Sequence, residues 1–172
     1  MYKHILVAVG TSLSQSALST AIARARECDA RLTALHVVDR TPWWAVVTGD
    51  CNVRDTAALI DDHARALTRY SLRQIESAGI DGTGVSVTLP PGVTVGEAIA
   101  KAANEAGADL IVLGGETDSG WGRGRERLRD VVCTQTRCDV LIAAHRARDA
   151  HTDIERETGN ARAMEAASAA RV

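Results

Sequence analysis

The chain has 172 residues, which fits one domain with a core large enough to need no metal or disulfide. Its 20 Lys and Arg residues face 22 Asp and Glu residues. This balance argues against a nucleic-acid or membrane-surface protein, which would be basic. No apolar run reaches the roughly 18 residues that a bilayer span needs. The N-terminus also lacks the pattern of a secretory signal, so we expect a cytoplasmic protein.

The first predicted strand covers residues 3–9, a short β-branched apolar run typical of a central parallel strand buried on both faces. Ser12 and Gln15 have the spacing of a capping box, so a helix is predicted from Leu13. A second strand is predicted over residues 32–38. It contains His36, which we interpret as a packed, hydrogen-bonded core histidine rather than a general base.

Residues 39–52 hold Pro42, Trp43 and Trp44 and predict a long connection or flap. We interpret the two tryptophans as a lid on the protein's own sheet; stacking on an adenine or on a partner chain is the alternative. A helix is predicted over residues 53–78, with Gly79 as its C-terminal cap. A third strand is predicted over residues 84–89.

The second half repeats this alternation. Thr94 and Glu97 form a second capping box, which starts a helix that ends near Gly107. A strand over residues 109–113, a glycine-rich loop over 114–124, a basic helix over 125–136 and a last strand over 139–144 follow. The order predicts a single-domain, five-stranded, parallel, doubly wound α/β sheet of Rossmann-like type. It spans residues 1–146, and residues 147–172 predict a mobile or marginally helical tail.

The cysteines and histidines show no metal-binding pattern. No Cys-x-x-Cys pair and no His-x-x-x-His spacing occurs, so no metal is predicted. We expect thiols that are buried or half-buried and unpaired. They are Cys28, Cys51, Cys133 and Cys138.

Ligands of such sheets bind beyond the carboxyl ends of the strands, so the tips of the first and fourth strands should meet in a crevice. The loops over residues 10–12 and 114–125 both precede helices, whose free N–H groups suit phosphate. The glycines and arginines of the second loop could form an anion cradle, with a solvated loop and helix face as the alternative. No Walker motif and no nucleophile–base set occurs.

Four segments resemble the universal stress protein family in their order and spacing: residues 1–9 (MYKHILVAV), 36–39 (HVVD), 107–114 (GADLIVLG) and 138–142 (CDVLI). The resemblance covers residues 2–146 and implies an adenine nucleotide alpha hydrolase-like fold. It implies a non-catalytic cytoplasmic protein that acts in stress response through an unknown protein partner. It also implies a homodimer through the last strand, residues 139–144, whose apolar edge would otherwise need a cover.

The family's nucleotide-binding branch carries Gly, two residues, Gly, nine residues and Gly-Ser/Thr. Its first position is Gly114, its second falls on Thr117, and its last pair falls on Arg127-Leu128 or, counted back from Cys138, on Glu126-Arg127. The family's Asp after the first strand is Gly10 here. The resemblance therefore points to the branch that requires no nucleotide.

The alternative keeps a site for ATP or AMP, with Val38 packed on adenine and loop amides on phosphate. Its lining residues would be Gly10, Thr11, Ser12, Val38, Leu113, Gly114, Gly115, Thr117, Gly122, Gly124, Arg125 and Arg127. A nucleotidyl transferase or ATP pyrophosphatase on a similar fold would need Ser-Gly-Gly-x-Asp-Ser or His-x-Gly-His. Neither occurs in the chain.

Overall fold

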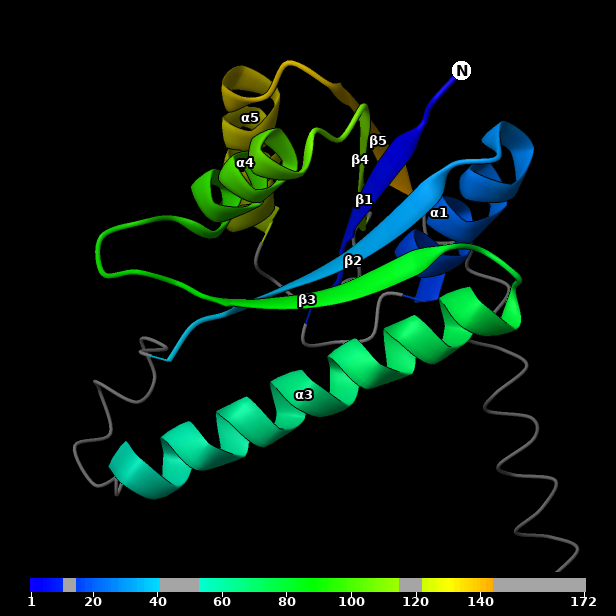
Figure 1. Ribbon diagram of the computed structural model, residues 1–172. Coiled ribbons are helices and arrows are strands. Elements are labelled where there is room, and N and C mark those ends of the chain that lie inside the picture. Colours follow the sequence, from blue (N-terminus) through cyan, green and yellow to red (C-terminus); the bar gives the residue numbers. More distant parts are fainter. Residues whose placement is uncertain (11–14, 41–52, 115–121, 144–172) are drawn as a thin grey trace, which may run out of the picture.

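The sheet has five parallel strands in the order β3-β2-β1-β4-β5 (Figure 1). The computed structural model describes residues 1–10, 15–40, 53–114 and 122–143. In the helices that begin at residues 53 and 122, side chains are described only from Ala57 and from Leu128 onward. The strands are β1 (His4–Ala8), β2 (Arg31–Val38), β3 (Gly82–Thr88), β4 (Leu110–Gly114) and β5 (Asp139–Ala143). The predicted five-stranded parallel sheet is confirmed.

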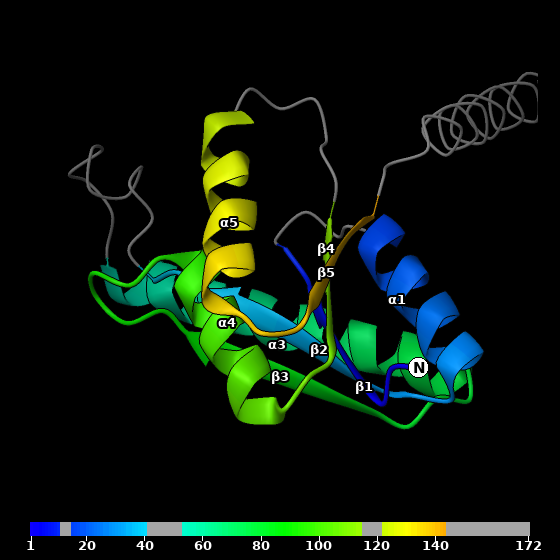
Figure 2. The same ribbon diagram turned by 90° about the horizontal axis from the view of Figure 1, so that it is seen from above.

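Helices cover both faces of this sheet. They are α1 (Gln15–Cys28), α3 (Val53–Ser77), α4 (Val95–Ala106) and α5 (Gly122–Gln135). Figures 1 and 2 show α1 and α3 on one face and α4 and α5 on the other. This is the doubly wound arrangement, which buries the central strands from two sides.

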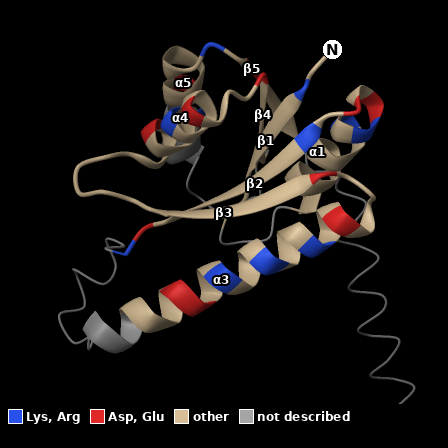
Figure 3. Ribbon diagram, viewed as in Figure 1, with Lys and Arg blue, Asp and Glu red and all other residues tan. Residues whose placement is uncertain are grey.

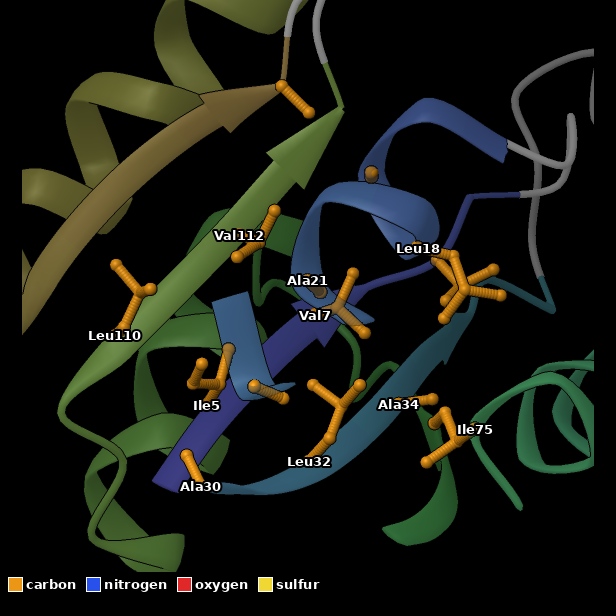
Figure 4. Close-up of a cluster of buried hydrophobic side chains, with 14 residues drawn as sticks. Ile5, Val7, Leu18, Ala21, Ala30, Leu32, Ala34, Ile75, Leu110 and Val112 are labelled. Carbon is orange, nitrogen blue, oxygen red and sulfur yellow. The ribbon is translucent and has the colours of Figure 1, made fainter. Parts of the chain in front are cut away.

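β1 lies at the centre, and its side chains divide between two cores. Ile5 and Val7 point into the core under α1, and Leu6 points into the core under α4 and α5; all three are fully buried. Figure 4 shows the first core, where small alanines such as Ala21 let α1 lie close to the strands. Each buried Val, Leu or Ile stabilises the fold by about 1.5–3 kcal/mol.

Two glycines set how closely helices pack. A Cβ built on Gly84 of β3 would lie 2.7 Å from Cγ2 of Thr68, so α3 can rest directly on this strand. A Cβ on Gly96 would lie 3.0 Å from Cβ of Val131, so the Val131 side chain of α5 packs directly against the backbone of α4.

The predicted caps are confirmed on the second half of the sheet. Thr94 Oγ1 accepts from the Glu97 N–H at 3.3 Å, and the Glu97 carboxylate accepts from the Thr94 N–H at 2.7 Å. Gly107 ends α4 in the left-handed conformation, with φ 62°, and Gly79 follows α3 with φ 73°. These positions favour glycine because it has no Cβ to clash there.

Several predicted details are wrong. β3 begins at Gly82 rather than residue 84, and α5 begins at Gly122 rather than residue 125. The glycine-rich loop is therefore shorter than predicted. Cys133 is exposed, not buried, while Cys28 and Cys138 are half-buried as expected. Cys51, Trp43, Trp44 and the predicted tail lie outside the described residues.

Candidate functional site

The carboxyl ends of β1 and β4 lie side by side. The two strands pair in parallel with Val7 opposite Val112, and β2 and β5 flank them on either side. The chain passes from β1 to β2 on one side and crosses to β4 on the other, so strand order reverses between β1 and β4. This is where open α/β sheets bind ligands, and the predicted meeting of the two tips is confirmed.

Small residues stand at these two tips. Gly10 is exposed just beyond β1, and Gly114 is half-buried at the end of β4. A glycine at each tip leaves backbone groups accessible to a ligand, because no Cβ stands in the way. Both residues were predicted to line the site, and the structure brings their strands together.

Two other predicted lining residues have buried side chains. Leu113 is 3% exposed and packs with Leu6 and Val132 in the core under α4 and α5. Val38 is 4% exposed, so little of its side chain is available to an adenine ring in this structure. Both side chains are buried, as expected in a sheet covered on both faces, and the lining role of these two residues stays a prediction.

The remaining predicted residues are placed only in part. Gly122, Gly124, Arg125 and Arg127 lie in the first turns of α5. For the two glycines this corrects the predicted loop over residues 114–124. Thr11, Ser12, Gly115 and Thr117 lie outside the described residues. Of these eight predicted lining residues, the structure therefore places only the four at the start of α5.

The helix starts at this edge differ in electrostatic character. The pKa of the Glu97 carboxyl is lowered, first by the backbone N–H of Thr94 and then by the Thr94 hydroxyl, which donates at 2.9 Å. This carboxylate interacts favourably with the positive N-terminal end of the α4 dipole. The first turns of α1 and α5, by contrast, contain no acidic residue.

A buried histidine lies directly under the tip of β1. His36 of β2 is 4% exposed, and its Nδ1 lies 2.8 Å from the carbonyl oxygen of Val9. The prediction of a packed, hydrogen-bonded histidine is confirmed. Its partner could not be predicted from sequence, because Val9 is 27 residues away along the chain.

An ion pair beyond β2 was also missed. Arg40 donates to both carboxylate oxygens of Asp61 in α3, from Nε at 3.1 Å and from Nη2 at 2.7 Å. Such a forked pair fixes the chain after β2 against the helix more firmly than a single contact would. No sequence pattern predicts this ion pair, because the distance between the end of a strand and the face of a helix depends on how the two pack.

The opposite, amino edge of the sheet holds the described surface hollows. One of about 440 Å³ is lined by Lys3, Arg26, Arg31 and Asp81 among others. A second of about 510 Å³ lies beside Tyr2 and Asp139. Figure 3 shows both signs of charge where the strands begin. Because these hollows lie at the amino ends of the strands, they are separate from the tips of β1 and β4, where the ligand was predicted to bind.

A second buried histidine closes this amino edge. His4, which is 5% exposed, has Nε2 2.8 Å from Thr33 Oγ1 and Nδ1 3.0 Å from the Ala106 carbonyl oxygen. Arg31 Nη2 lies 3.0 Å from the same Nδ1. Burial and then the Arg31 charge lower the pKa of His4, against the opposing effects of the Ala106 carbonyl and Asp109.

Neither a metal nor a membrane is indicated by the described part of the chain. Among those residues, no three His, Cys, Asp or Glu side chains gather in a way that could hold a metal ion. No helix within the described ranges is long and apolar enough to cross a bilayer.

The family model described as the universal stress protein family matches residues 1–144. The chain belongs to this family. No curated protein matches its sequence. The match contains the four segments on which the sequence resemblance rested, and these lie at or next to β1, β2, β4 and β5.

Solved universal stress proteins share the fold. One from Burkholderia pseudomallei is 27% identical, with a TM-score of 0.63 over 82% of this chain and 95% of that one. A protein from Arabidopsis thaliana, solved with AMP bound, is 15% identical, with a TM-score of 0.61 over 86% and 94%. A third, from Archaeoglobus fulgidus in complex with dAMP, is 20% identical, with a TM-score of 0.56 over 82% and 97%.

Proposed function

We propose that this chain is a non-catalytic universal stress protein that binds an adenine mononucleotide in the crevice between β1 and β4. The observation that carries the proposal is the parallel pairing of these strands, with Gly10 and Gly114 at their tips. Strand order reverses there, and backbone groups at both tips are open to a ligand. Members of the same fold were solved with AMP and dAMP.

The phosphate is assigned to the start of α5. Its first turn contains Arg123 and Arg125 and no acidic residue. The positive end of the helix dipole and the charge of these two arginines therefore both favour an anion there. α4 is a poorer choice because Glu97 already occupies its N-terminus. The family's closing Gly-Ser/Thr pair is replaced by Arg127-Leu128 or Glu126-Arg127. This replacement removes backbone contacts for a long phosphate chain and favours AMP over ATP.

The proposal excludes turnover. Of the predicted lining residues, the described Gly10, Val38, Leu113 and Gly114 carry neither acid nor base, and hydrolysis of a phosphoanhydride needs a group that positions or activates water. We propose that the nucleotide instead regulates binding of a protein partner. With labelled ATP, we expect no release of phosphate above that of a protein-free control.

Isothermal titration of the full chain with AMP tests the binding step. We expect heat with AMP in the millimolar range or below, and weaker heat with ATP. Gly114→Asp should abolish it, because the carboxylate would repel phosphate at the tip of β4. Thr83→Asp adds the same charge at an exposed residue of β3, near the amino edge, and should bind as wild type. No heat with either nucleotide in wild-type protein would refute the proposal.

A homodimer through β5 is the second part of the proposal. β5 is an edge strand, and its Ile142 is 41% exposed. An exposed apolar edge invites pairing with another strand, and a second copy of β5 offers one. In sedimentation at micromolar concentration we expect dimers, which Ile142→Lys should dissociate. Val85→Lys, at a residue of edge strand β3 that is 37% exposed, should leave them intact. A monomeric wild type would contradict this part alone.

A further inference from the structure

The end of β1 is held by a side chain where a backbone bond would be expected. The Val9 N–H donates to the Leu35 carbonyl at 2.8 Å, one residue beyond the strand. The next rung of a parallel ladder would bring a backbone N–H of β2 to the Val9 carbonyl. In this structure the His36 ring nitrogen Nδ1 lies 2.8 Å from that oxygen.

The chemistry of this contact fixes the state of the ring. A carbonyl oxygen only accepts, so Nδ1 of His36 must carry the proton and donate it to Val9. Both residues are buried, at 4% and 7% exposure, so a lost bond could not be replaced by bulk water. The next residue, Gly10, is exposed. The bond therefore governs the direction in which the chain leaves the sheet at the crevice.

We propose that His36 is a positioning residue of the nucleotide site. It holds the Val9 carbonyl through Nδ1–H and thereby sets the backbone of Gly10 opposite the tip of β4, without touching the ligand itself. This inference rests on the proposed function. It adds a residue that contacts the backbone next to Gly10 instead of the ligand.

Substitutions that move or remove the donor test the role. His36→Asn keeps an amide N–H at the position of Nδ1, and His36→Gln carries its amide N–H farther out, near the position of Nε2. His36→Leu has no donor. In titrations with AMP, we expect Asn to keep affinity within about twofold, and Gln and Leu to weaken it about tenfold, as loss of one buried hydrogen bond predicts.

The second buried histidine provides a matched control. His4 is also buried in the sheet and also contacts a backbone carbonyl, that of Ala106, but at the amino edge. His4→Leu should lower stability to urea and leave AMP affinity unchanged. The proposal is wrong if folded His36→Gln binds AMP as tightly as wild type, or if His4→Leu weakens binding as much as His36→Leu does.

A measurement without nucleotide separates the two levels of inference. In long-range ¹H–¹⁵N spectra at about pH 8, His36 should be the Nδ1–H tautomer; an Nε2–H tautomer overturns the positioning role. If wild type binds no AMP although His36 is the Nδ1–H tautomer, the proposed function fails and His36 is a structural residue only. If wild type binds AMP and the variants do not differ, the positioning role alone fails.

Discussion

The two edges of the sheet are built in opposite ways. At the amino edge, polar side chains connect neighbouring elements: His4 joins Thr33, Tyr2 donates to Asp139 at 2.8 Å, and the Lys3 N–H donates to the Asp109 carboxylate at 2.6 Å. The hydroxyl bond to Asp139 also raises the pKa of Tyr2. At this edge the protein's own polar groups therefore connect the starts of neighbouring strands.

The carboxyl edge ends instead in small residues. β1 runs out through Ala8 to Gly10, and β4 and β5 end at Gly114 and Ala143. His36 supports this edge from below, through a bond to the backbone. Polar side chains thus bridge the strand starts at the amino edge, whereas small residues stand at the ends of β1, β4 and β5, where the proposed nucleotide site lies.

The largest expected effect comes from filling the crossing of α4 and α5, which holds the start of α5 at the carboxyl edge. Gly96→Val would place atoms against Val131 and the Leu128 carbonyl, 3.0 and 3.2 Å from the new Cβ. We expect a loss of about 3 kcal/mol from overpacking, measured by urea unfolding. AMP affinity should fall too, because the first turn of α5 moves.

Lys101→Val provides the control for this change. Lys101 is an exposed residue of the same helix, so the substitution adds a β-branched side chain without a clash and should cost less than about 1 kcal/mol. Equal losses in the two variants would show that the close crossing at Gly96 is not what positions α5.

The second prediction concerns how stability depends on pH, through His4 at the amino edge. Burial lowers the pKa of His4, so the unfolded chain takes up a proton near pH 6.5 while the folded chain resists it. Stability should therefore fall as pH drops below about 6.5 and stop falling below the folded pKa. The charges that face this ring are those of Arg31 and Asp109.

Urea midpoints between pH 8 and pH 5 measure this dependence. His4→Gln, which cannot titrate, should flatten the curve in that window. Glu97 loses its stabilising charge only at lower pH, because its carboxyl pKa is lowered from 4.5. A wild-type curve with the same slope as the variant would remove His4 as the group responsible.

The layered fold could be predicted because it depends on local patterns. Apolar runs such as residues 3–9, the Thr94–Glu97 capping box and Gly107 each carry their signal within a few residues. The start of α5 could not, because glycines at 120, 122 and 124 favour a loop on propensity alone. Propensity is a weak guide where tertiary contacts compete with it.

The site was predictable only in outline. Position relative to strand ends identified Gly10 and Gly114, since every parallel strand delivers its tip to the same edge. The partner of His36 and the pairing of Arg40 with Asp61 depend on which strands and helices become neighbours. Leu113 lies at the tip of a predicted strand, but its side chain packs in the core under α4 and α5, which the sequence pattern alone does not indicate.

The capping box offers a smaller test, because it asks whether all helix starts at the carboxyl edge are equivalent. Thr94→Ala removes the hydroxyl that accepts from the Glu97 N–H and should cost about 1 kcal/mol, with Thr94→Ser close to wild type. AMP affinity should not change, because the phosphate is assigned to α5. A tenfold change in affinity would move the anion to α4.

The smallest effect concerns a polar group that serves neither edge. Ser71 lies on the buried stripe of α3 with Ala64, Leu67 and Ile75; it is fully buried, and its Oγ has no hydrogen-bond partner among the described residues. Ser71→Ala should raise stability by about 0.5–1 kcal/mol, since an unsatisfied hydroxyl is removed and alanine favours the helix. Ser77→Ala is the control, because that exposed hydroxyl donates to the Gln74 carbonyl at 2.9 Å. If Ser71→Ala destabilises the chain while Ser77→Ala is neutral, the Ser71 hydroxyl has a partner, and α3 contributes a polar contact that neither edge accounts for.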